Sequence, residues 1–204
     1  LMGMNVWKRL TQDKLFLLCV ITIGIIMFAG IFAEIIAPHD PAEVNVKVKL
    51  SGISFQYPLG TDKLGRCILS RLIYGIRTTV FFALLTMSIT IIIGTLIGIL
   101  AGFYRGIVDD FIMRFCDVML SFPSEVMILA LVGMMGPNLR NVVIANILVK
   151  WPWYARMIRG SVLTYMDKNY IRFAKLSGLS NINIIRKHII PVIAGEVSVL
   201  ATLD

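Results

Sequence analysis

The chain has 204 residues, of which 57% are hydrophobic and 16% are charged, and its net charge is +8. Soluble domains carry about 25% charged residues and are less apolar, so this composition excludes an ordinary soluble protein. The cations flank apolar runs instead of clustering with aromatic residues. This pattern favours attraction to lipid headgroups and argues against nucleic acid as a partner.

Residues 1–37 predict a short polar lead followed by a first transmembrane helix. Residues 15–33 contain no charge and are about as long as one membrane crossing requires. A cleaved signal peptide is the alternative. The apolar run is longer than a usual signal core, however, and no small-residue cleavage pattern follows it.

Residues 38–77 predict an extracytoplasmic loop. Glycine and proline mark turns along this segment, and the apolar residues after the last turn recur at helical spacing. We therefore expect an amphipathic helix at the membrane interface, formed around Leu69, Leu72, Ile73 and Ile76.

Residues 78–204 predict a helical core. Residues 78–104 are uncharged, and Gly94, Gly98 and Gly102 share one helix face, where small residues let another helix approach closely. A lateral helix is expected at 108–120, and further spans are expected at 122–136, 141–154 and 189–203. Pro152 is expected to kink the span that contains it.

Glu125 has two interpretations. It follows Ser121-Phe122-Pro123-Ser124, a sequence typical of a helix start, where an acid is stabilised by the positive end of the helix dipole. An acid at membrane depth is also a candidate for contact with a cationic substrate on a transport pathway.

Residues 170–191 read YIRFAKLSGLSNINIIRKHIIP and form a polar, basic interruption between apolar spans. Gly178 separates two runs with helical spacing, which predicts two short helices with one apolar face and a cationic back. Such a pair either lies on anionic lipid or docks a cytosolic partner.

The spacing of Gly178, Ile190 and Pro191 resembles the coupling segment of permease subunits of bacterial ABC importers. The family has Glu-Ala-Ala ahead of the glycine, whereas this chain has Arg172, Phe173 and Ala174, so only the last alanine matches. His188 stands where the peptide and nickel branch has histidine. The outer-loop run Pro-Leu-Gly-Thr-Asp, two residues, Gly-Arg, then Ser-Arg-Leu-Ile-Tyr-Gly also resembles that branch.

The resemblance implies an all-α, polytopic transmembrane bundle of the type I ABC importer permease fold. In that family the last span continues and another follows, so we expect the chain to be truncated after the start of its fifth span. The coupling segment is expected at 161–188. The resemblance assigns ATPase coupling to Tyr170, Arg172, Phe173, Ala174, Gly178, His188 and Pro191.

The implied partners are a second permease subunit, two ATP-binding subunits, an extracellular solute-binding protein and membrane lipid. The implied location is the bacterial inner membrane. Residues 153–157, 176–178 and 199–204 resemble the nickel branch more closely, so nickel ion or a nickel chelate is the expected substrate. A di- or oligopeptide is the alternative, and a non-transporting membrane scaffold is an alternative of another class.

The chain contains no GxxxxGK[ST] phosphate-binding loop, so ATP is expected on partner subunits and no cofactor on this chain. The sequence shows no catalytic motif, so an enzyme is not expected. Cys19, Cys67 and Cys116 lack the spacing of a disulfide framework or metal site, and no residue pattern predicts metal coordination. Lysine and arginine are more numerous in the segments that lie inside when the N-terminus is cytoplasmic, which favours that orientation.

Overall fold

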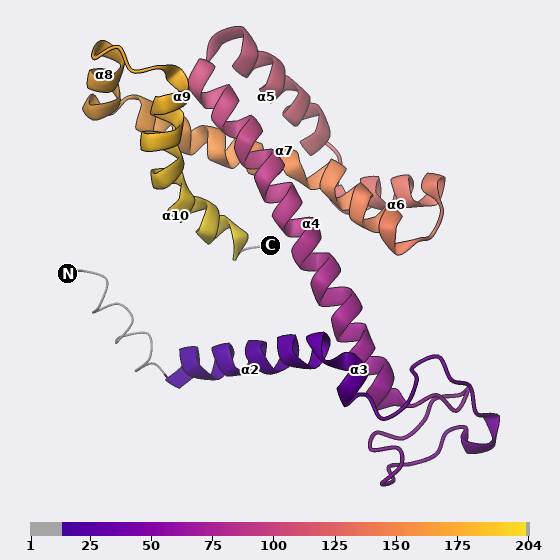
Figure 1. Cartoon of the computed structure of the whole chain (residues 1–204). Coiled ribbons are helices and arrows are strands. Elements are labelled where there is room, and N and C mark those ends of the chain that lie inside the picture. The colour runs from indigo at the N-terminus through magenta and orange to yellow at the C-terminus, as the bar shows by residue number, and fades with distance from the viewer. Residues whose placement is uncertain (1–13, 203–204) are drawn as a thin grey trace. The chain divides into compact units, whose positions relative to one another are not determined.

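The computed structural model describes residues 14–202, which are helical apart from the loops that join the helices (Figure 1). Within this range there is no β-strand, only an isolated bridge between Thr61 and Cys67. The expected all-α class is confirmed. Two compact units make up the chain, one ending at Phe82 and one beginning at Ala83, and each is described by itself.

The first unit contains α2 (Lys14–Ile31), the short α3 (Ala33–Ile36), a 3-10 turn η1 (Val46–Val48) and the first turns of α4 (Ile68–Tyr104). Gly30 of α2 lies so close to α4 that an added Cβ would be 3.3 Å from Cγ2 of Ile76. Arg77 donates a hydrogen bond to Glu34 at 2.7 Å. These contacts connect the first membrane helix to the start of the second.

The interfacial helix expected around Leu69 to Ile76 is not separate, because these residues form the first turns of α4. The sequence from Ile68 to Tyr104 contains no proline, and a glycine inside a helix costs only about 1 kcal/mol, so nothing ends the helix at residue 77. At 37 residues α4 is about 55 Å long, more than the hydrocarbon core of a bilayer. Its first turns therefore have room to extend into the interface.

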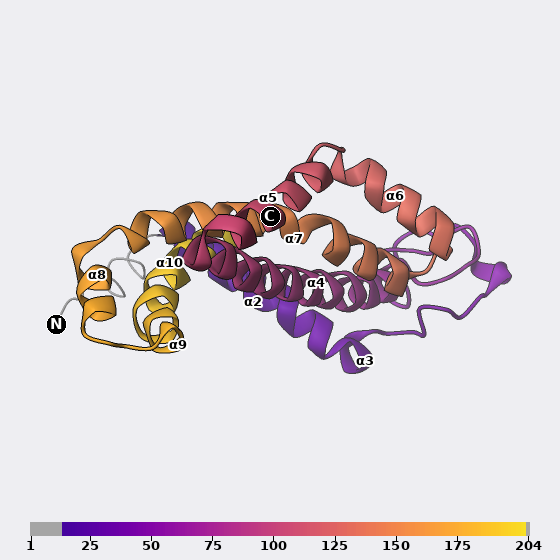
Figure 2. The same cartoon turned by 90° about the horizontal axis from the view of Figure 1, so that it is seen from above.

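The central helix of the second unit is α7 (Leu139–Met166). It packs against α5 (Gly106–Leu120), α6 (Ser124–Met135) and α10 (Ile190–Ala201). The short helices α8 (Asn169–Leu176) and α9 (Asn181–Ile184) lie at one end of α7, whereas α6 lies at the other (Figure 2). A π-helical turn, η2 (Ile185–Ile189), joins α9 to α10. The expected lateral helix at 108–120 is confirmed as α5.

The glycine face of α4 packs directly on α7, as the four-residue spacing predicts. A Cβ added at Gly98 would lie 2.6 Å from the carbonyl oxygen of Ala155, and one at Gly102 would lie 2.8 Å from Cβ of Val162. The two backbones thus approach to a separation that only glycine permits.

Two of the described helices, α2 and α4, are long and apolar enough to cross a membrane. The pair α5 and α6, bent by 82° between them, adds a third crossing if it is counted as one broken span. The expected spans at 141–154 and 189–203 correspond to α7 and α10. Neither helix is long and apolar enough to count as a membrane crossing. α7 carries four cations, and α10 has only 12 residues.

Candidate functional site

The stretch 170–191 folds as two short helices that lead into a third. α8 follows the end of α7 after Asp167 and Lys168, and α9 continues through η2 into α10 without a break. The helix–turn–helix predicted for this stretch is confirmed. Its first helix ends at Leu176 and its second begins at Asn181.

Gly178 ends α8 in a conformation that favours glycine. Its φ is +76°, in the left-handed region, and its amide donates to the carbonyl oxygen of Lys175 at 3.1 Å. The amide of Leu179 donates to the carbonyl oxygen of Ala174 at 3.3 Å. These two bonds form a Schellman motif, which satisfies carbonyl groups that the end of a helix leaves unpaired.

Pro191 explains the wider turn before α10. A proline has no amide hydrogen to donate to Lys187, four residues earlier, and its ring would clash with that carbonyl group in a regular α-helix. The helix widens into a π turn over Ile185–Ile189 and then continues as α10 with Pro191 in its first turn. The proline thereby marks the passage from the short helices into α10.

One face of this stretch is buried and holds it to the rest of the unit. We call it the anchor face and define it as Ile171, Ala174, Ile184 and Ile189, each less than a tenth exposed. These residues belong to the same apolar cluster as Phe103 of α4 and several side chains of α7 and α10. The anchor face therefore holds α8 and α9 in one cluster with side chains of α4, α7 and α10.

A second face is apolar but exposed. We call it the docking face and define it as Tyr170, Phe173, Leu176 and Ile182; Phe173, Leu176 and Ile182 are 68%, 83% and 73% exposed. Large apolar residues exposed together are typical of an interaction site. The single apolar face predicted from the sequence is thus wrong: the apolar residues divide into an inward and an outward set.

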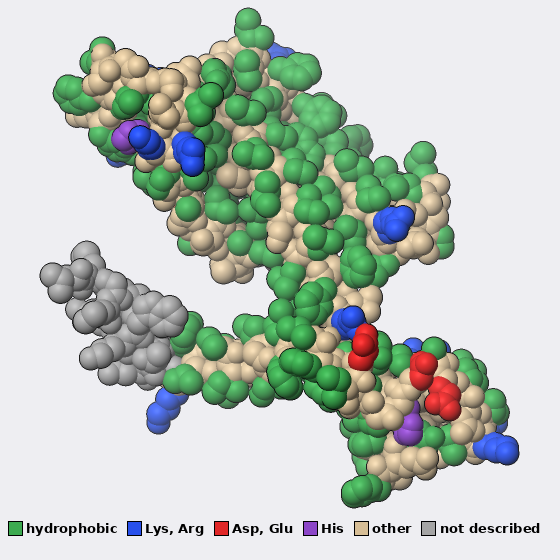
Figure 3. Space-filling view, viewed as in Figure 1, with side chains coloured by type: hydrophobic (Ala, Val, Ile, Leu, Met, Phe, Trp, Pro, Cys, Tyr) green, Lys and Arg blue, Asp and Glu red, His purple; other side chains and the backbone are tan. Residues whose placement is uncertain are grey.

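The remaining predicted coupling residues are divided between the two faces. Arg172 is exposed, Ala174 belongs to the anchor face, and the ring of His188 lies 6.3 Å from that of Tyr170. Cations accompany the exposed apolar side chains at this end of the second unit (Figure 3). The structure thus brings Tyr170 and His188 together across the gap between α8 and η2.

Ion pairs connect α5 and α4 to α7, and sequence reasoning did not identify them. Arg159 donates to both carboxylate oxygens of Asp109, at 2.9 and 2.5 Å. Arg156 pairs with Asp117, and Arg105 pairs with Asp167 at 3.0 Å. The partners are tens of residues apart in sequence, so no local spacing indicated the pairs. They fix the lateral helix to the helix that carries α8.

A second acid within an apolar helix was also missed. Glu196 of α10 accepts a hydrogen bond from the Tyr165 hydroxyl at 3.0 Å, which connects α10 to α7. The sequence contained a signal for this residue, because Glu196 lies in an apolar run and acids within such runs are functional candidates.

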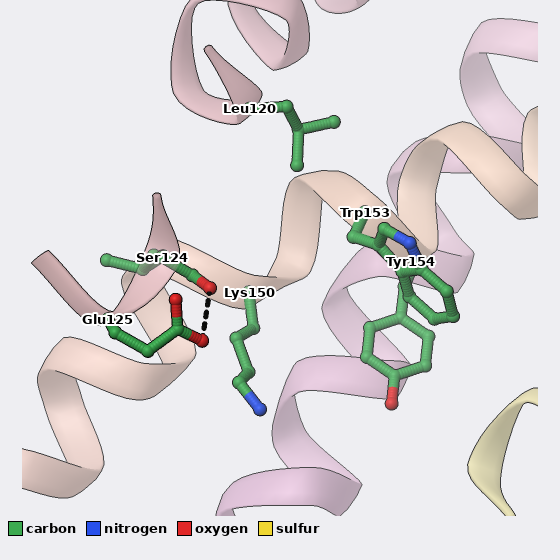
Figure 4. Close-up of a pocket in the computed structure, with 7 residues that line it drawn as sticks. Leu120, Ser124, Glu125, Lys150, Trp153 and Tyr154 are labelled. Atoms are coloured by element: carbon green, nitrogen blue, oxygen red, sulfur yellow. Dashed lines mark hydrogen bonds between the residues drawn. The ribbon is translucent and has the colours of Figure 1, made fainter. Parts of the chain in front are cut away.

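Glu125 lies in the first turn of α6, as the helix-start interpretation predicts. Its carboxylate accepts a hydrogen bond from the Ser124 hydroxyl at 2.9 Å. It also borders a cavity of about 300 Å³ between α6 and α7, together with Lys150 and two aromatic residues (Figure 4). Both interpretations of Glu125 are therefore compatible with its position.

The outer loop of the first unit is organised by Asp62. Its carboxylate accepts hydrogen bonds from the amides of Leu64 and Arg66, at 2.9 and 3.0 Å, and from the side chains of Arg66 and Arg71, at 2.8 and 2.6 Å. Desolvation opposes ionisation, but these hydrogen bonds outweigh it and hold the pKa of Asp62 well below its ordinary value. The family-like run around Asp62 therefore has a structural role as a turn.

Within residues 14–202, no three histidine, cysteine or carboxylate side chains are grouped to bind a metal ion. Cys67 and Cys116 are buried and Cys19 is exposed, and all three are free.

Comparison with known proteins gives consistent matches over both units. Residues 94–204 match the family described as binding-protein-dependent transport system inner membrane component. Residues 2–56 match the N-terminal TM domain of oligopeptide transport permease C.

Three curated proteins illustrate the range of relatives. The metal-staphylopine import system permease protein of Staphylococcus aureus is 41% identical over 202 residues, covering 98% of this chain and 69% of the relative. The dipeptide transport system permease protein of Alkalihalophilus pseudofirmus is 34% identical over 197 residues, which cover 97% of this chain and 65% of the relative. The nickel transport system permease protein of Escherichia coli is 32% identical over 187 residues, which cover 92% of this chain and 68% of the relative.

Proposed function

Because the chain belongs to the family of binding-protein-dependent transport system inner membrane components, we propose that it moves nickel ion or a nickel chelate across the cell membrane. It is a membrane-spanning permease subunit of an ABC importer. The relatives named for metal-staphylopine and nickel support a metal-bearing substrate. A di- or oligopeptide is the second candidate, because a dipeptide permease protein is 34% identical.

The observation that supports coupling to an ATPase is the pairing of an exposed docking face with a buried anchor face on the same short helices. In this proposal an ATP-binding subunit contacts Tyr170, Phe173, Leu176 and Ile182 from the cytoplasm. Arg172 and His188 border the contact, and Gly178 and Pro191 set the turn geometry. Apolar side chains exposed in a monomer become favourable when a partner covers them.

The anchor face then gives the contact a mechanical consequence. Ile171 and Ala174 pack in the cluster that includes side chains of α7, while Ile184 and Ile189 lie just before α10. Closure of two ATP-binding subunits on nucleotide would move α8 and α9, and these would tilt α7 and α10 together. ATP is bound by the partner subunits in this account, and this chain contributes the moving helices.

The complete importer in this proposal also contains a second permease subunit and an extracellular solute-binding protein. The N-terminus lies in the cytoplasm, so that α8 and α9 face the ATP-binding subunits. The excess of lysine and arginine in the segments that then lie inside supports this orientation.

Site-directed crosslinking tests the docking proposal. In a Cys19→Ser background, Arg172→Cys or Lys175→Cys should form a crosslink to a cysteine on an ATP-binding subunit, because both positions are exposed beside the docking face. Arg140→Cys is the matched control, since it is exposed at the opposite end of α7. Absence of a crosslink from both α8 positions in an actively transporting complex would contradict the docking role.

Uptake assays test the substrate and the scaffold alternative together. Cells with and without the chain are compared for accumulation of radioactive nickel, with and without a chelator, and of a labelled dipeptide. Chain-dependent accumulation of nickel supports the proposal, and accumulation of the dipeptide alone favours the second candidate. A chain that co-purifies without ATP-binding subunits and changes neither uptake would be a scaffold.

A further inference from the structure

Positive charge accompanies the docking face, and no acid balances it. Residues 168–195 contain five lysine or arginine residues and neither aspartate nor glutamate. Solvated protein surfaces usually mix both signs, because like charges repel each other. Figure 3 shows lysine and arginine side chains at this end of the second unit and no acid beside them on the face in view. The segment therefore presents an excess of positive charge together with exposed apolar side chains.

The acids that flank this segment in sequence already have partners. Asp167, just before α8, pairs with Arg105 at 3.0 Å. Glu196 of α10 accepts a hydrogen bond from the Tyr165 hydroxyl at 3.0 Å. Neither acid is left to balance the cations that lie between them in sequence.

Four cations of the segment are exposed and form no ion pair with the described residues of this chain. We call them the cationic rim and define it as Lys168, Arg172, Arg186 and Lys187. Lys175 is left out of the rim, because its Nζ lies 5.2 Å from the centroid of the Phe103 ring. The charges of the rim are thus available to a partner.

The rim alternates with the docking face at helical spacing. Arg172 precedes Leu176 by four residues on α8, and Arg186 follows Ile182 by four residues along the run from α9 into η2. Side chains four residues apart are neighbours on a helix, so each of these exposed apolar side chains has a guanidinium group beside it. A guanidinium group matches a carboxylate through two parallel hydrogen bonds.

The direction of the docking face favours a soluble partner over a lipid surface. Successive residues of an α-helix are about 100° apart, so Leu176 is about 200° from Ala174 and about 140° from Ile171, on the far side of α8 from the anchor face. The anchor face shares a cluster with Phe103, at the end of the membrane-crossing helix α4. The docking face of α8 therefore points away from that cluster, at the far end of α7 (Figure 2).

We propose that the docking face and the cationic rim together fit an ATP-binding subunit whose contact surface is apolar at its centre and carries aspartate or glutamate at its edge. The apolar centre covers Phe173, Leu176 and Ile182, and the carboxylates face Arg172 and Arg186. The inference rests on the proposed docking function and adds the chemistry of the partner. In such an interface the apolar centre supplies most of the affinity, while the charges at the edge steer the encounter and select the partner.

Binding of purified ATP-binding subunits to the full-length permease pair tests the inference. The permeases are held in phosphatidylcholine nanodiscs, and surface plasmon resonance gives the dissociation constant. Raising the salt from about 50 mM to about 500 mM should weaken binding several-fold, because salt screens exposed charges. Arg172→Glu and Arg186→Glu should each raise the dissociation constant about tenfold at the lower salt, as expected when a close charge pair is broken.

Matched variants separate loss of the charge pairs from damage to the permease. Arg140→Glu reverses an exposed charge at the opposite end of α7 and should bind like the wild type. Arg172→Lys and Arg186→Lys keep the charge and should recover most of the affinity. All of these positions are exposed, so the thermal midpoints of the variants should equal that of the wild type.

An exchange of charges across the contact is the decisive measurement. Mass spectrometry of the crosslink formed by Arg172→Cys identifies the segment of the ATP-binding subunit that it faces. The aspartate or glutamate closest to the crosslinked position is then changed to lysine. This partner variant should bind the wild-type permease weakly and the Arg172→Glu permease with nearly wild-type affinity.

Three results would overturn the inference and leave the docking function intact: binding that does not depend on salt, a crosslinked segment without an acid, or a charge exchange that restores no affinity. Nanodiscs that also contain phosphatidylglycerol test the lipid alternative. If Arg172→Glu and Arg186→Glu weaken binding only in these nanodiscs, the rim acts on lipid headgroups and the inference is wrong. A wild-type permease that binds no ATP-binding subunit would instead refute the docking function, and the inference with it.

Discussion

At the scale of single residues, carboxylates organise both units. The Asp62 carboxylate accepts four hydrogen bonds in the outer loop. The Asp109 carboxylate of α5 accepts two hydrogen bonds from Arg159 of α7. The two sites differ in burial. The side chain of Asp109 is 8% exposed and that of Arg159 is 33% exposed, so loss of this pair leaves a charge with restricted access to water.

Asp109→Asn should destabilise the protein by about 2 kcal/mol, since Arg159 would lose a charged, bidentate partner while remaining partly exposed. A fall in the thermal midpoint of the detergent-solubilised permease measures the change. Asp117→Asn is the control, because its pair with Arg156 is exposed on both sides and exposed pairs contribute about 0–1 kcal/mol. Equal midpoints for the two variants would contradict this ranking.

Asp62→Asn should loosen the outer loop and speed amide hydrogen exchange at Leu64 and Arg66, which donate to the carboxylate in the native loop. The pKa of Asp62 is lowered in the folded state, so its stabilisation is complete above its ordinary value of 3.8 and is lost as the pH falls toward the folded value. The protection of these amides relative to an unfolded chain should therefore be unchanged between pH 5 and pH 7. Asp40→Ala, which removes a single amide contact elsewhere in the loop, should leave the protection of Leu64 as it is.

At the scale of helices, close approach and helix ends decide the arrangement. α4 lies against α7 because Gly94, Gly98 and Gly102 present no side chain there. The left-handed Gly178 ends α8, and the π turn before Pro191 lets α9 continue into α10. A long contact and two local backbone features thus place the docking face at the end of α7.

Gly98→Ala should separate α4 from α7, because the new Cβ would lie 2.6 Å from the carbonyl oxygen of Ala155 and a backbone atom cannot swing aside. Overpacking of this kind costs about 1–3 kcal/mol. Gly160→Ala in α7 has no atom within 4 Å of its Cβ and should be neutral or stabilising. Thermal midpoints and the yield of assembled complex are the measurements, and equal behaviour of the two variants would refute the close packing.

At the scale of the whole molecule, the proposed membrane topology makes a prediction about which residues face each side of the membrane. Two described helices meet the length and polarity of a crossing, and α5 with α6 supplies a third if counted together. The proposed cytoplasmic N-terminus puts Ile53 outside and Lys175 inside. Both positions are exposed, so each reports its side by chemical labelling.

In a Cys19→Ser background, Ile53→Cys should react with a membrane-impermeant maleimide in intact spheroplasts, whereas Lys175→Cys should react only after the membrane is opened. Cys67 and Cys116 are buried and should contribute little background. Labelling of Lys175→Cys from outside would reverse the orientation and remove the docking face from the ATP-binding subunits.

The sequence by itself determined the features that depend on the local preferences of single residues. Apolar runs indicated the membrane helices α2 and α4, glycine every fourth residue indicated the close helix contact, and Gly178 indicated the end of the first short helix. Each of these signals comes from the local preference of a residue for lipid, for close packing or for a backbone angle.

Only the tertiary structure decided which surfaces face each other. It divided the apolar residues of 170–191 into an anchor face and a docking face, because burial of Ile171 and Ile184 depends on a cluster that several helices form together, including α4. It paired Asp109 with Arg159 and brought Lys150 to the cavity of Glu125. Such pairs depend on how helices cross, and a crossing geometry is set by packing across the whole unit, which no local pattern contains.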